Sequence, residues 1–218
     1  MSGSSESRRT FLLSVGAAAA SSALIPSMAS GLTPAATASP DWLATLKGKK
    51  HKQLFDIPSV NDGFGLAYAA NFLDVYNKAF NTPDSELGAV VVVRHLGATL
   101  AVGDNIWAKY KLGTVTNVND PKTKAPADYN RWRNPREGDL PLPNMQLSKL
   151  QARGVIVGVC DMALTFLSMM TAQNAGVSPE DAKKEWVASL PQGAVVVPVG
   201  VVAVNQAQEH GCTYCFGG

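Results

Sequence analysis

Three cysteines are the residues of this chain best suited to covalent chemistry: Cys160, Cys212 and Cys215. Cys160 follows the apolar run 155–159 directly and precedes a helical pattern that begins at Asp161. A thiol at such a junction faces the unpaired N–H groups of a helix N-terminus, which favour the thiolate, the form that attacks or carries sulfur. The sequence therefore predicts a reactive Cys160, with a buried and inert structural cysteine as the alternative that residue type leaves open.

Two basic residues, Arg94 and His95, follow the valine-rich run 89–93 in the same way. Because ligands of open parallel sheets bind outside the carboxyl ends of the strands, we expect both side chains near Cys160. His95 would accept a proton or stabilise the thiolate, and Arg94 would hold an anionic sulfur species. The alternatives are a histidine bonded to a loop carbonyl and an arginine that caps the strand end in solvent.

The C-terminal tail combines His210, Cys212 and Cys215 in an H-x-C-x-x-C pattern, which could bind zinc or copper with one ligand missing. Residues three apart in a strand point to opposite faces, so the two cysteines are not expected to bond to each other. Haem attachment would need a histidine where Phe216 stands. An edge strand without chemistry is the alternative, and we predict no resident metal or other cofactor.

Gly63-Phe64-Gly65 lies between a predicted strand and a predicted helix, as in dinucleotide sites. The third glycine of that fingerprint is missing, because Tyr68 stands there. A turn is therefore the better interpretation.

The segment 113–143 is polar and rich in proline, and it contains Arg131-Trp132-Arg133. We interpret it as an excursion over the surface. An exposed aromatic side chain between arginines is typical of an interface anchor, which predicts a contact between subunits. A solvated loop is the alternative.

Apolar runs alternate with helical patterns, which indicates α/β architecture. We predict a flavodoxin-like, five-stranded parallel sheet with helices on both faces and right-handed crossovers. The predicted strands are 52–57, 89–93, 155–159, 194–197 and 212–216. The predicted helices are 65–80, 104–112, 146–152, 161–174, 178–190 and 201–210.

Three segments together resemble the DsrE/DsrF-like family: 150–155 leading to Cys160, then 190–202, and the ending 206–214. The resemblance runs in order from about His51 to the C-terminus, except over 113–143. It implies a flavodoxin-like α/β fold, a homo-oligomer, and transport of sulfur as a cysteine persulfide on Cys160. It also implies a sulfur donor or acceptor protein, or a small sulfane-sulfur species, as the partner.

The N-terminus carries the pattern of an export signal. Ser7-Arg8-Arg9-Thr10-Phe11-Leu12 leads into the apolar run 11–25, and small residues follow at 27–29 and 36–38. The arginine pair indicates the twin-arginine route. A retained anchor is the alternative, although the run is shorter than the ~20 residues that span a bilayer. We expect 1–38 to be a signal and leader, and 39–218 to be one periplasmic domain that no longer contacts the membrane.

Charge excludes some functions. The chain has 218 residues and a formal net charge of only +2, a balance that gives no electrostatic footprint for nucleic-acid or anionic-membrane binding. We therefore expect no nucleic-acid partner.

Overall fold

The computed structural model describes residues 41–218, so the predicted signal at 1–38 lies outside the described residues. A five-stranded, all-parallel sheet has the order β4-β3-β2-β1-β5. The predicted flavodoxin-like α/β fold is confirmed. The strands are β1 (His51–Ile57), β2 (Leu87–Val93), β3 (Ile156–Cys160), β4 (Val195–Val197) and β5 (Thr213–Phe216).

The helices connect consecutive strands, as a parallel sheet requires. They are α2 (Phe64–Phe80), α3 (Asp104–Lys109), α4 (Leu112–Thr116), α5 (Leu147–Ala152), α6 (Asp161–Ala175), α7 (Pro179–Ala188) and α8 (Gly200–Glu209). The predicted helix 104–112 is instead two short helices, because Lys111 between them has a left-handed backbone with φ of 54°. No helix within 41–218 has the length and apolar character that would let it cross a bilayer.

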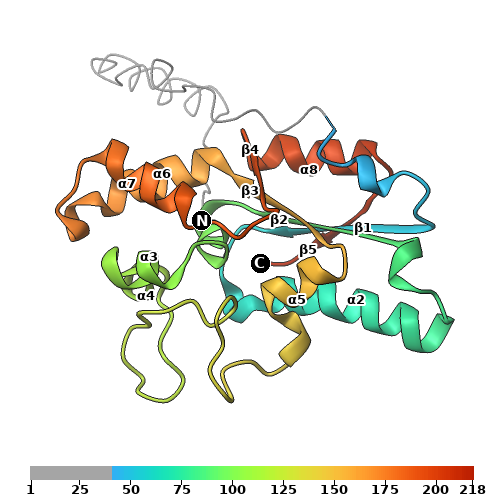
Figure 1. The fold of residues 1–218 in the computed structure, drawn as a ribbon, viewed down its shortest axis with the longest axis horizontal. Coiled ribbons are helices and arrows are strands. Elements are labelled where there is room, and N and C mark those ends of the chain that lie inside the picture. Colours follow the sequence, from blue (N-terminus) through green and yellow to red (C-terminus); the bar gives the residue numbers. More distant parts are fainter. Residues whose placement is uncertain (1–40) are drawn as a thin grey trace, which may run out of the picture. The chain divides into compact units, whose positions relative to one another are not determined.

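The sheet separates two hydrophobic cores. Alternate residues of each strand point to opposite faces, so Phe55, Val91 and Val157 enter the larger core together with α2. Leu54 and Val90 enter the smaller core, which α8 completes. Figure 1 accordingly shows α8 on one side of the sheet and α2 with α5 on the other. β2 is buried along its whole length, which explains its continuous run of apolar residues.

The segment 113–143 is tied to the core, which corrects the interpretation of Trp132 as an interface anchor. Trp132 has no exposed surface and packs against Trp107, with ring centroids 5.9 Å apart. Its indole N–H donates to the carbonyl of Asp62 at 3.2 Å. The buried Asn130 amide donates to the carbonyls of Leu100 and Val102 at 2.9 and 2.8 Å. The indole ring therefore stabilises this chain internally.

Gly63 forms a turn, as expected, and close packing against Trp132 explains why this residue is a glycine. The residue has φ of 76°, and a Cβ there would lie 2.0 Å from the indole nitrogen of Trp132. Glycine is therefore required by the approach of Trp132.

Candidate functional site

Cys160 is the last residue of β3 and the N-cap of α6. Its sulfur accepts hydrogen bonds from the backbone N–H groups of Ala163 at 3.4 Å and Gly200 at 3.1 Å. Ala163 lies in the first turn of α6, and Gly200 is the first residue of α8. The sulfur therefore lies at the N-termini of two helices, whose N–H groups and dipoles stabilise negative charge. Cys160 is 5% exposed, so access to it is narrow.

Arg94 is the neighbour of Cys160 on the adjacent strand. The last pair in the β2–β3 ladder is Val93 with Val159, so Arg94 and Cys160 occupy the next step. Gly200 lies against both side chains. A Cβ at Gly200 would be 2.6 Å from the Cβ of Arg94 and 3.3 Å from that of Cys160. The structure thus brings Arg94 and Cys160 together, and the absence of a side chain at Gly200 permits it.

Asp56 holds the guanidinium of Arg94, a relationship that sequence analysis missed. Nε and Nη2 of Arg94 donate to the two carboxylate oxygens at 2.7 and 2.9 Å. The hydroxyl of Tyr214 donates to Oδ2 of the same carboxylate at 2.9 Å. Asp56 is 2% exposed and interrupts an otherwise apolar stretch of β1. A charged residue inside a buried strand was the signal that could have identified it.

The charges of this cluster support one another. The hydrogen bonds that Arg94 donates to Asp56 are the main cause that raises the pKa of Arg94 against desolvation, and the negative charge of Asp56 adds to the rise. Burial raises the pKa of Tyr214, and its hydrogen bond to Asp56 raises it further. Tyr214 therefore remains a neutral donor to the carboxylate at physiological pH.

Asp161, the residue after Cys160, is a second buried carboxylate, 3% exposed. Its Oδ2 accepts a hydrogen bond from Nζ of Lys183 on α7 at 2.9 Å. Its Oδ1 has no hydrogen-bond partner in the described part of the chain. The sequence contains no indication of this pair, because Lys183 lies in a run of charged residues that is typical of a solvated helix face.

His95 is exposed at the start of a 3-10 helix (His95–Leu100) and has φ of 48°. Left-handed backbone is uncommon for residues other than glycine, although histidine adopts it more often than most. No hydrogen bond joins its ring to Cys160 or to any other residue between 41 and 218. Its role beside the thiolate stays a prediction.

The tail residues do not assemble a site. Cys212 is buried in the core beneath α8, whereas Cys215 packs against the core on the opposite face, which confirms that the two do not bond. Nδ1 of His210 lies 2.8 Å from the carbonyl of Gln206. Within residues 41–218, no three His, Cys, Asp or Glu side chains gather around a common point. The H-x-C-x-x-C pattern therefore does not form a metal-binding cluster here.

The environments of Cys212 and Cys215 disfavour the thiolate, which is the nucleophilic form of cysteine. Burial raises the pKa of Cys212, against a smaller opposing effect of Lys52, and burial likewise raises the pKa of Cys215. Both groups therefore stay protonated at neutral pH. Cys160 differs from both in its contacts, because its sulfur accepts two backbone N–H groups.

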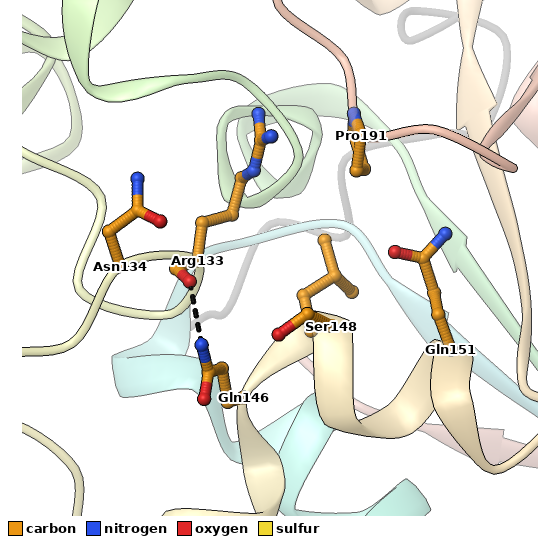
Figure 2. A pocket seen from close by; sticks show the side chains of 7 residues that line it. Arg133, Asn134, Gln146, Ser148, Gln151 and Pro191 are labelled. Carbon is orange, nitrogen blue, oxygen red and sulfur yellow. Dashed lines mark hydrogen bonds between the residues drawn. The ribbon is translucent and has the colours of Figure 1, made fainter.

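A separate small hollow lies between α5, the 113–143 segment and Pro191 (Figure 2). It has a volume of about 150 Å³ and is lined mainly by polar side chains, among them Arg133, Gln146 and Gln151. The amide of Gln146 donates to the carbonyl of Arg133 at 2.9 Å. Ligand pockets usually measure ~300–1,000 Å³, so this hollow suits water better than a substrate.

Comparison with protein-family models, with curated proteins and with solved structures finds no match for this chain. The resemblance to the DsrE/DsrF-like family therefore rests on the sequence motifs alone.

Proposed function

We propose that this protein is an exported sulfur carrier of the DsrE/DsrF-like type, which holds sulfane sulfur as a persulfide on Cys160. One observation carries the proposal. The sulfur of Cys160 accepts N–H groups from the first turns of α6 and α8, and Arg94 lies beside it. A thiolate and a terminal persulfide anion would both be stabilised by these donors.

The burial of Cys160 suits a carrier better than an enzyme that turns over a bulky substrate. The residue is 5% exposed, which admits a small sulfur species and hinders larger reactants. Limited access would also slow oxidation of a thiolate along the sulfenic and sulfinic acid series. His95 is retained in the proposal as a proton acceptor at the edge of the site.

We also propose that the protein self-associates, and the exposed apolar side chains of α6 support this proposal. Met162, Phe166 and Met170 lie one turn apart on the outer face of this helix and are 47%, 52% and 50% exposed. Val201, on the first turn of α8, is 58% exposed. Contiguous apolar surface of this kind is typical of interaction sites. A subunit contact here would begin two residues after Cys160.

The burial of Cys160 also favours a second candidate, a non-catalytic oligomeric binding module with an inert thiol. Alkylation of the native protein at pH 7 with a small iodoacetamide reagent, followed by peptide mass spectrometry, separates the two. The carrier requires Cys160 to react much faster than Cys212 and Cys215, whose thiols stay protonated. Equal protection of all three until denaturation would favour the binding module.

Export rests on Arg8 and Arg9, which lie outside the described residues. Replacement of both by lysine keeps the charge and removes the paired arginines that the twin-arginine route reads. We expect the double variant to stay in the cytoplasm, whereas the parent is recovered from the periplasm in a shorter form. Equal periplasmic recovery of both chains would contradict twin-arginine export.

A further inference from the structure

A charged residue, Asp56, lies in the buried carboxyl end of β1. Asp56 is 2% exposed, and its oxygens accept three hydrogen bonds, two from Arg94 and one from Tyr214. The three residues come from neighbouring strands, since Asp56 lies in β1, Arg94 follows β2 directly and Tyr214 lies in β5. A buried carboxylate is tolerated when its lone pairs are satisfied in this way. The arrangement fixes the plane of the guanidinium beside Cys160.

The fixed guanidinium keeps one edge free. Asp56 occupies the edge made by Nε and Nη2 of Arg94. The N–H groups of Nη1, and the second one of Nη2, make no hydrogen bond within residues 41–218. This second edge is a planar fork that fits two oxygens of an oxyanion. The side chain of Arg94 is 27% exposed, so an ion can reach the fork from solvent.

We infer that the free edge of Arg94 binds the oxyanion end of a small sulfane-sulfur donor of the thiosulfate class, and that Asp56 and Tyr214 are the positioning residues that aim it. The inference rests on the proposed function of Cys160 and names its donor. Arg94 would hold the sulfonate oxygens, and the sulfane sulfur of the donor would lie toward the thiolate of Cys160 on the adjacent strand end.

The transfer step balances without an oxidant. The Cys160 thiolate attacks the sulfane sulfur of thiosulfate, and a new S–S bond forms at Sγ. The S–S bond of thiosulfate breaks, and its electron pair leaves with sulfite. The products are the Cys160 persulfide anion and the sulfite dianion, whose combined charge equals that of the thiolate and thiosulfate. Negative charge grows on the departing sulfite, where the guanidinium lies.

Donor selectivity tests this inference. The rate at which Cys160 is modified would be followed by intact mass with two donors. Thiosulfate adds one sulfur and releases sulfite. The neutral compound dimethyl trisulfide leaves a methyl disulfide or methyl trisulfide on Cys160 and releases methyl persulfide or methanethiolate. Arg94→Gln should slow transfer from thiosulfate about tenfold or more, because a charge-assisted pair of hydrogen bonds is lost. The same change should slow the reaction with the trisulfide less, because that reaction loses only the stabilisation of the thiolate, and the ratio of thiosulfate to trisulfide rates should therefore fall. Arg94→Lys should restore only part of the thiosulfate rate, since an ammonium has no fork.

Tyr214→Phe tests positioning separately from charge. It removes one hydrogen bond to Asp56 and leaves the ion pair with Arg94 in place. We expect the thiosulfate concentration at half-maximal rate to rise about threefold to tenfold, with little change in the maximal rate or in the trisulfide rate. Arg136→Gln, which changes an exposed arginine of the 113–143 segment that pairs with Asp120, is the matched control and should leave the rates with both donors unchanged.

Two outcomes would overturn the inference. One is an unchanged ratio of thiosulfate to trisulfide rates in Arg94→Gln, with transfer from both donors intact. The other is an unchanged affinity for thiosulfate when Arg94→Gln is added to the Cys160→Ser variant, as measured by calorimetry. Absence of transfer from either donor, with thiosulfate still bound through Arg94 in Cys160→Ser, would instead overturn the proposed function and uphold the oxyanion site.

Discussion

The sulfur of Cys160 lies 3.1 Å from the backbone nitrogen of Gly200, the first residue of α8. This contact joins the β3–α6 junction to the start of the helix that covers the opposite face of the sheet. A side chain at Gly200 would enter the space that Arg94 and Cys160 already fill. The geometry of the thiol site therefore depends on a residue 40 positions away in sequence.

Gly200→Ala is expected to displace the start of α8 from the sulfur, because the added Cβ would lie 2.6 Å from the Cβ of Arg94. Overpacking of this kind costs about 1–3 kcal/mol of unfolding free energy. Urea denaturation would measure the loss, and native alkylation would show slower reaction of Cys160. Val202→Ala, at a largely exposed position in the first turn of α8, is the control and should change neither. An alanine variant with parental stability and reactivity would contradict this packing.

Arg153 lies at the centre of a polar cluster that should contribute to the loss of folding stability at acidic pH. Its guanidinium donates to Asp74, Asn77 and Asp84. The hydrogen bond from Arg153 is the main cause that lowers the pKa of Asp84, against desolvation. A carboxylate with a lowered folded-state pKa contributes stability that is present above its unfolded pKa of about 4 and is lost as the pH falls through the folded value.

Arg153→Met is therefore expected to cost about 1–3 kcal/mol at pH 7. The difference between variant and parent should begin to shrink below about pH 4, and it should be lost as the pH falls through the lowered folded-state pKa of Asp84. Thermal denaturation from pH 3 to pH 7 would measure it. Lys184→Met, which removes a surface ion pair, is the control with a small effect throughout. A constant difference across this pH range would rule out the proposed linkage.

Trp132→Ala should destabilise the monomer, since the indole is fully buried against Trp107. Truncation of a buried tryptophan costs about 3–5 kcal/mol. Trp132→Phe keeps most of the apolar volume and should cost less, mainly through the lost hydrogen bond to Asp62. Chemical denaturation gives both values, and light scattering gives the subunit number. A change in subunit number with unaltered stability would return Trp132 to the role of interface anchor.

Phe166→Glu should weaken self-association, because it places a charge in the exposed apolar face of α6. The expected result is a shift toward the monomer in size-exclusion chromatography with light scattering. The variant should remain folded, with a cooperative thermal transition. Phe80→Glu, at the exposed end of α2, is the matched control and should leave the assembly intact. Equal behaviour of the two variants would argue against an α6 interface.

Much of the fold could be predicted because its signals are local. The valine run of β2 and the apolar run before Cys160 each indicate a buried strand from a few residues. The N-cap Ser178, which accepts the N–H of Asp181 at 3.1 Å, is visible from the start of α7 alone. The position of Cys160 at a strand end beside a helix start followed from the same local patterns.

The rest depends on contacts between distant segments. Gly200 reaches the sulfur only because α8 crosses to the other face of the sheet, and Tyr214 reaches Asp56 only because β5 pairs with β1. Trp132 was misinterpreted because its sequence neighbours are polar, whereas its packing partner, Trp107, lies on α3. Local composition carries no information about such pairs.

The central claim is that Cys160 carries sulfane sulfur, and the most direct test is the intact mass of the mature protein before and after brief exposure to polysulfide without reductant. The parent should gain whole-sulfur increments that reductant reverses. Cys160→Ser should gain none, whereas Cys212→Ser and Cys215→Ser should gain as the parent does. Increments that persist in Cys160→Ser, or no increment in any chain, would contradict the account.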